Sequence, residues 1–211
     1  MTVLGAAALV LACGGPATTR ADEAKVYAAL LADPEMRDPA ACGILSDPDL
    51  RGDCGVVVAE RRMAEGTPVE GLCAGMEHGV WADECRFRAA EKSMRSGDPD
   101  TAARLCLSVE RFRNACAQHL WDPELAGVWH GPDVGGALER GRVLHAAWAR
   151  RLDGATDLDD RFWRHWFRLG FVHGVPLPAD ADAFCAEVPR DLAGPCLKAV
   201  GRAIAEARGN R

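Results

Sequence analysis

Eight cysteines fall into four pairs along the chain, and their spacing restricts how the chain can fold. The pairs are Cys42 and Cys54, Cys73 and Cys85, Cys106 and Cys116, and Cys185 and Cys196. The first cysteines of the first three pairs are 31 residues (42 to 73) and 33 residues (73 to 106) apart. A period in this range is typical of stacked helical hairpins.

The geometry of a disulfide adds a second restriction. Cysteines twelve residues apart on one continuous helix would be separated by about 18 Å, whereas a disulfide needs Cα atoms within about 7 Å. A bond within a pair therefore requires the helix to break between its members. Breakers stand in three of the pairs, at Asp47-Pro48, at Gly79, and at Pro189 with Gly194-Pro195. The third pair has none between Leu107 and Asn114.

The composition around the cysteines is helical. Alanine, leucine, arginine and glutamate dominate, and no apolar–polar alternation of the kind found in strands lasts long. We therefore predict an all-α fold of stacked helical hairpins. Each disulfide is expected to join the end of one helix to the first turn of the next. Links between neighbouring units, such as Cys54 to Cys73, are the alternative connectivity.

The beginning of the chain indicates export. Residues 1–12 form an uncharged apolar run, too short for the roughly 20 residues of a transmembrane helix. The run ends Val10-Leu11-Ala12-Cys13, which resembles the lipobox of bacterial lipoproteins. The resemblance implies that residues 1–12 are a removed signal peptide, that Cys13 is acylated, and that residues 13–21 are a tether.

Two features depart from the lipobox pattern. Leu11 is bulkier than the usual residue there, and the run carries no Lys or Arg. An apolar N-terminal helix with a buried cysteine is the alternative. No aspartate follows Cys13, so the resemblance implies the periplasmic side of the outer membrane. In that oxidising compartment the eight remaining cysteines are expected to form disulfides.

Residues 22–211 are expected to form a single domain. Its repeat length and its one disulfide per hairpin resemble those of tetratricopeptide-like and cysteine-rich α-hairpin repeat proteins, over about residues 40–116 and the last unit. The likeness is one of plan, because the tetratricopeptide signature positions are missing. It therefore implies no binding residues.

Charge and motifs narrow the function classes. The net charge of −6 is spread over interspersed signs, which argues against nucleic acid as a partner. The chain has no C-x2-C, C-x-x-C-H, G-x-S-x-G or phosphate-loop motif, so we assign no catalytic residue, metal or cofactor.

A cysteine-free insert at residues 117–184 interrupts the repeat. It holds Trp121, Trp129, Trp148, Trp163 and Trp166, with His119, His130, His145, His165 and His173. A loop is expected over 122–134, with helices over 135–152 and 158–171. The aromatic residues are expected to replace the missing disulfides as core. The alternative is a partner surface made of Arg161, Arg164, Arg168, Trp163 and Trp166.

The sequence therefore suggests a lipid-anchored envelope protein that acts as a protein-binding or scaffold module. Its partner would be an unidentified envelope protein. The alternative is a metal-binding protein or an enzyme that uses the histidines and tryptophans of the insert, although no H-x-x-x-H or H-E-x-x-H pair occurs.

Overall fold

The computed structural model describes residues 19–74, 76, 79–130, 133–153 and 156–209, and every element in these ranges is helical. The elements are α1 (Arg20–Ala32), η1 (Pro39–Ile44), α2 (Pro48–Ala64), α3 (Val69–Ala74), α4 (Gly79–Arg95), α5 (Pro99–Leu107), α6 (Arg113–Ala126), α7 (Val134–Arg151), α8 (Thr156–Val172), α9 (Ala181–Ala186), η2 (Arg190–Leu192) and α10 (Ala193–Gly209). The predicted all-α fold is confirmed. Cys13 and the expected signal peptide lie outside the described residues, and the expected tether ends inside α1.

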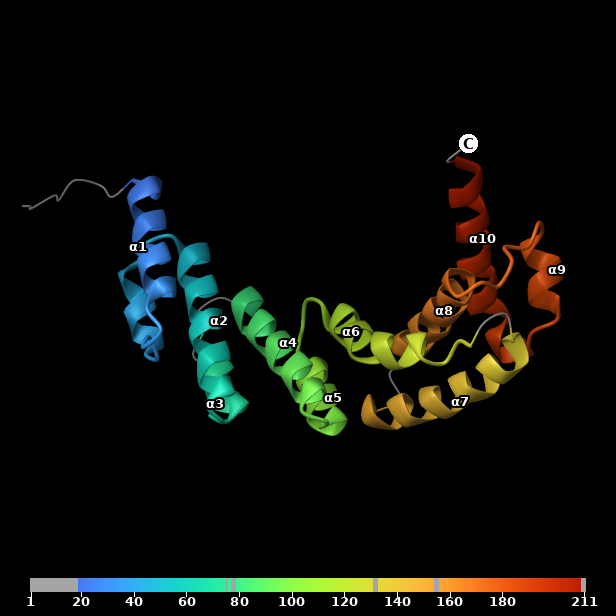
Figure 1. Cartoon of the computed structure of the whole chain (residues 1–211), viewed down its shortest axis with the longest axis horizontal. Coiled ribbons are helices and arrows are strands. Elements are labelled where there is room, and N and C mark those ends of the chain that lie inside the picture. Colours follow the sequence, from blue (N-terminus) through green and yellow to red (C-terminus); the bar gives the residue numbers. More distant parts are fainter. Residues whose placement is uncertain (1–18, 75, 77–78, 131–132, 154–155, 210–211) are drawn as a thin grey trace, which may run out of the picture.

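The helices form a crescent (Figure 1). Helices α2, α4, α6, α8 and α10 follow one another along its inner side, and each packs on the next. Helices α3, α5, α7 and α9 lie on the outer side. The crescent is thus a row of hairpins, each made of an outer helix followed by an inner one, and α1 stands at its N-terminal end. Packing between neighbours is how repeat arrays build a continuous core.

Each of four disulfides joins the two elements of one hairpin, so all four follow the expected pairing within units. They are Cys42–Cys54, Cys73–Cys85, Cys106–Cys116 and Cys185–Cys196, with Cα–Cα distances of 5.9, 5.5, 5.5 and 5.8 Å. Each joins the first element of a hairpin to its inner helix. Cys54 and Cys85 lie in the second turn of α2 and α4, one turn deeper than expected. Hairpin α7/α8 carries no disulfide.

Short sequence signals start and stop several of these helices. Asp38-Pro39, Asp47-Pro48 and Asp98-Pro99 each place an aspartate at the N-cap and a proline in the first turn. Each aspartate accepts a hydrogen bond from a backbone N–H of the first turn, and proline needs no partner there. Near the ends of α2 and α4, Gly66 (φ 88°) and Gly97 (φ 81°) adopt the left-handed conformation that glycine tolerates best.

A tertiary contact supplies the break that the third pair lacks in sequence. Helix α5 ends at Leu107 and α6 begins at Arg113. Between them, the backbone N–H groups of Glu110 and Arg111 donate to the carboxylate of Asp83 at 3.0–3.2 Å. Asp83 lies on α4, in the preceding hairpin, and is 2% exposed. A buried side chain of one repeat therefore shapes the turn of the next.

The expected loop over 122–134 is wrong in its first part. Helix α6 continues to Ala126 with Pro123 inside it. Proline inside a helix removes one backbone hydrogen bond. The helix continues because Leu120, Trp121 and Leu125 on it are at most 1% exposed, and their burial favours the helical path.

The core is continuous from α2 to α10. One large cluster of buried side chains runs from Val56 to Val200, and a smaller one, centred on Leu45 and Val58, fills the first hairpin. This continuity fixes the inner helices relative to one another.

Candidate functional site

A charged cleft of about 180 Å³ lies between α6, α8 and α10. Most of its lining is charged: Arg161, Arg164, His165 and Arg168 come from α8, and Lys198, Arg202 and Glu206 come from α10. Gln118 of α6 completes the polar lining. All three helices belong to the inner layer of the crescent. We call this site the basic cleft.

Helix α8 has two faces of different character, and this amphipathicity places its arginines in the cleft. Phe162, Trp163, Trp166 and Phe167 are between 1% and 6% exposed and face the core. Arg161 and Arg168 are exposed, while Arg164 and His165 are half-buried at the edge of the cleft. Burial of the aromatic face therefore leaves the basic face free to line a binding surface.

Several of the cations in the cleft have acidic partners, and two do not. The carboxylate of Asp160 lies 3.0 Å from the Arg164 Nε atom and 3.1 Å from the Lys198 Nζ atom. Arg202 pairs with Glu206 at 2.8 Å. Arg161 and Arg168 have no acidic partner in the part of the chain that the structure describes. Their positive charge is available to a ligand.

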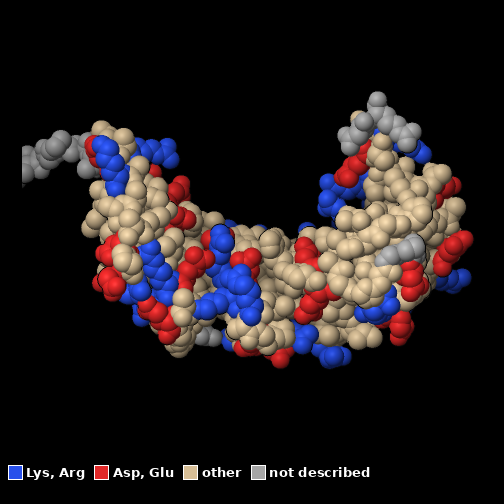
Figure 2. Space-filling model, in the orientation of Figure 1, with Lys and Arg blue, Asp and Glu red and all other residues tan. Residues whose placement is uncertain are grey.

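The cleft is positive in a protein that is negative as a whole. Five lining side chains are Arg or Lys and one, Glu206, is acidic, whereas the whole chain has a net charge of −6. Converging cations of this kind attract carboxylate or phosphate groups and raise their local concentration. Figure 2 shows basic side chains on the inner edge of the C-terminal arm, facing the hollow of the crescent.

The inner layer of the N-terminal half is different, because its charges pair with one another. Arg88 of α4 lies 2.8 Å from Glu84 and 3.7 Å from Glu60 of α2. His119 of α6 lies 3.6 Å from Glu91 of α4. Two of these contacts link neighbouring inner helices. The C-terminal arm is therefore the better candidate for recognition of a charged partner.

The two tryptophans of the expected partner surface are not on the surface. Trp163 and Trp166 are 6% and 1% exposed. Trp166 packs against Trp129, with ring centroids 4.4 Å apart, and against Trp163 at 5.8 Å. The aromatic-core interpretation is right for both residues, because large apolar rings gain most from leaving water. The structure brings Arg161, Arg164 and Arg168 together in one cleft, as the partner-surface alternative required.

The histidines of the insert do not converge. His145 Nε2 lies 3.0 Å from an oxygen of Asp159, and His165 Nε2 lies 3.0 Å from Asp122. Among the described residues, no three His, Cys, Asp or Glu side chains lie close enough together to hold a metal ion. The imidazoles instead orient against single carboxylates, and His145 also packs against the Phe162 ring.

Sequence reasoning missed the contribution of α10 to the site. Lys198 and Arg202 are four residues apart and so share one helical face, which is a weak signal by itself. Only the packing of α10 on α8 places them opposite the three arginines.

Within the described ranges no helix has both the length and the apolar character needed to cross a bilayer. No family model, curated protein or solved structure matches this chain.

Proposed function

We propose that this protein is a lipid-anchored scaffold of the cell envelope that binds an acidic segment of a partner protein in the basic cleft. The observation that carries the proposal is the pair Arg161 and Arg168, exposed in a concave site and without acidic partners among the described residues. A carboxylate-rich segment would supply the missing counter-charges.

The architecture supports a binding role. The inner helices form a concave surface, and curved helical arrays use such surfaces to hold extended partners. The arms of the crescent are stiffened by four disulfides, so little conformational entropy is lost when a partner binds. Four disulfides in a chain of this size also favour an oxidising compartment outside the cytosol. The residues Val10-Leu11-Ala12-Cys13 favour attachment to the membrane there.

The cleft can be tested with a fluorescently labelled oligoglutamate peptide and anisotropy measurements. The double variant Arg161→Ser/Arg168→Ser should weaken binding by about tenfold or more, because each charge-assisted hydrogen bond is worth roughly 1.5–3 kcal/mol. Binding to the unaltered protein should weaken as salt increases.

Arg95→Ser/Arg150→Ser is the matched control, because it removes the same charge from two exposed arginines outside the cleft. The control should bind the peptide nearly as well as the unaltered protein. Both double variants should have melting temperatures within a few degrees of that of the unaltered protein, because substitution of an exposed side chain changes the free energy of unfolding by up to about 0.5 kcal/mol. Equal weakening in both would mean that net charge, and not the cleft, attracts the peptide.

The anchor is tested separately by fractionation of cells that produce Cys13→Ser. Acylation on the cysteine sulfur requires a thiol, so the variant should leave the membrane fraction. If the variant stays in that fraction, the lipobox interpretation is wrong, whatever the cleft binds.

A further inference from the structure

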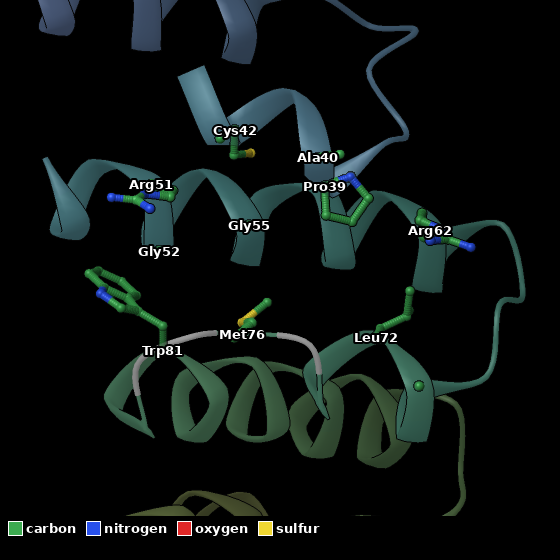
Figure 3. A pocket seen from close by; sticks show the side chains of 12 residues that line it. Pro39, Ala40, Cys42, Arg51, Gly52, Gly55, Arg62, Leu72, Met76 and Trp81 are labelled. Atoms are coloured by element: carbon green, nitrogen blue, oxygen red, sulfur yellow. The ribbon is translucent and has the colours of Figure 1, made fainter. Parts of the chain in front are cut away.

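A second cavity lies at the opposite end of the crescent, between the first two disulfide-linked hairpins. It has a volume of about 330 Å³, within the range of small-molecule sites. Pro39, Ala40 and Cys42 of η1 form one wall, and Gly52 and Gly55 of α2 form another. Leu72 of α3, Trp81 of α4 and Met76, which lies between these two helices, form the third (Figure 3).

Glycines on one face of α2 keep this space open. A Cβ at Gly55 would meet only the Met76 Cε atom, at 3.6 Å, which is ordinary contact. A Cβ at Gly52 would lie 2.1 Å from the Trp81 ring, so the indole needs glycine there to pack flat against α2. A larger side chain at position 55 would therefore project into the cavity without clashing at its Cβ.

The charged side chains among the described lining residues of the cavity have one sign. Arg51 and Arg62 line it, and no carboxylate side chain is among its described lining residues. The Trp81 Nε1 atom is buried and has no hydrogen-bond partner in the described part of the protein. A buried donor without an acceptor costs roughly 1–3 kcal/mol, and a ligand that accepts from it recovers that cost.

The polar groups also have a direction. Figure 3 shows the Arg51 guanidinium and the Trp81 indole at one end of the cavity, Arg62 at the other end, and Met76 and Leu72 between them. Arg51 also donates to the Ser46 carbonyl oxygen, at 3.2 Å, and this bond holds the arginine in place. The cavity thus offers two neighbouring donors, Arg51 and the Trp81 indole, at one end, and an apolar surface between that end and Arg62.

We propose that this cavity binds a small amphiphilic carboxylate, such as a medium-chain fatty acid. The carboxylate accepts from the Trp81 Nε1–H and lies beside Arg51. The chain packs on Leu72, Met76 and the glycine face of α2. This site is separate from the basic cleft and does not depend on its function.

Titration calorimetry with decanoate on the disulfide-intact protein tests the proposal. The unaltered protein should bind one decanoate saturably, and Gly55→Leu should lose more than about tenfold in affinity because its side chain occupies the cavity. Gly201→Leu is the matched control. Gly201 lies at mid-helix in α10, where a Cβ meets nothing within 4 Å, and it does not line the cavity. This control should bind like the unaltered protein.

Two further comparisons test whether the ligand's carboxylate binds at the end of the cavity that holds Trp81 and Arg51. Trp81→Phe keeps a ring but removes the N–H, so decanoate should bind about two- to tenfold more weakly. Decanol, whose hydroxyl is an uncharged and weaker acceptor, should lose less affinity. Decanol should bind the unaltered protein more weakly than decanoate. The proposal is rejected if decanoate binding does not saturate or if Gly55→Leu binds as well as Gly201→Leu. Equal affinity for decanol and decanoate would reject the carboxylate end.

Discussion

The hairpins that carry a disulfide, which we call clipped hairpins, are assembled on the same plan as hairpin α7/α8. The two kinds of hairpin hold their helices together in different ways. In α3/α4 and α5/α6 a disulfide joins the helices, and alanines and cysteines dominate the buried residues around it. Around α7/α8 there is no disulfide, and four tryptophans and two phenylalanines are buried: Trp129, Trp148, Phe162, Trp163, Trp166 and Phe167.

The clipped hairpins and hairpin α7/α8 are therefore stabilised in different ways. A disulfide acts mainly by lowering the entropy of the unfolded chain, so the helices can meet over small side chains. Aromatic rings act in the folded state, by burying a large apolar area. They also demand space, and glycines provide it. A Cβ at Gly141 would lie 2.6 Å from the Trp166 Nε1 atom, and one at Gly170 would lie 2.7 Å from the Trp129 ring.

Reduction of the four disulfides should change the stability of the protein more than any other test of this contrast. Loops of 10–12 residues are closed by each disulfide, and each closure is worth about 2–3 kcal/mol. Four such losses approach the total stability of a typical domain, about 5–15 kcal/mol. Thermal melts with and without a reductant should therefore differ by tens of degrees. Hydrogen exchange of the reduced protein should show α8 losing protection after α2 and α4. Earlier loss in α8 would contradict the division between the two kinds of hairpin.

Trp166→Ala should have the next largest effect. Truncation of a fully buried tryptophan costs about 3–5 kcal/mol, because it removes apolar burial and leaves a cavity. Denaturant unfolding measures the loss. Trp81→Ala is the comparison in a clipped hairpin, where the ring is only half-buried, and it should cost less, about 1–2 kcal/mol. If Trp166→Ala leaves stability intact but abolishes partner binding, the ring belongs to an interface and not to the core.

Alanine at two buried glycines should change stability in opposite directions. Gly141→Ala forces a methyl group against Trp166 and should destabilise the protein by about 1–3 kcal/mol. Gly55→Ala, in a clipped hairpin, meets only ordinary contact and should stabilise α2 by about 0.5–1 kcal/mol, since alanine restricts the unfolded chain. The same unfolding experiment measures both variants. A gain in stability at Gly141 would show that the tryptophan can move aside.

The smallest effect concerns Tyr27, the single tyrosine of the chain, which packs on the small core of the first hairpin. Burial raises its pKa to about 12, and the hydrogen bond that it donates to Asp53 adds to the shift. The stability linked to this shift is fully present below the unfolded pKa of about 10. It is lost as the pH rises from there through the folded pKa. Ultraviolet titration of the phenol should show the raised pKa, and Asp53→Asn should lower it. An unshifted titration would mean that Tyr27 faces water.

Some of the site could be inferred from the sequence. The arginines at positions 161, 164 and 168 follow helical spacing, so their common face was predictable, as was the helix that carries them. The fate of Trp163 and Trp166 was ambiguous, because aromatic residues serve cores and interfaces alike. Lys198 and Arg202 could not be assigned to the site, since no local signal reports which helices become neighbours.

The sequence by itself determined the class of fold and the hairpin units, because helix propensity, Asp-Pro caps and cysteine spacing act over short stretches of chain. Cysteine spacing favoured pairing within units but left links between neighbouring units open, and the structure has the pairing within units. Tertiary structure alone decided the features that depend on distant segments meeting. Asp83 breaks the helix of the next hairpin, burial of Leu125 carries α6 past Pro123, and α10 completes the basic cleft. In each case the free energy of a long-range contact, invisible to local spacing, outweighs or completes what the local sequence prefers.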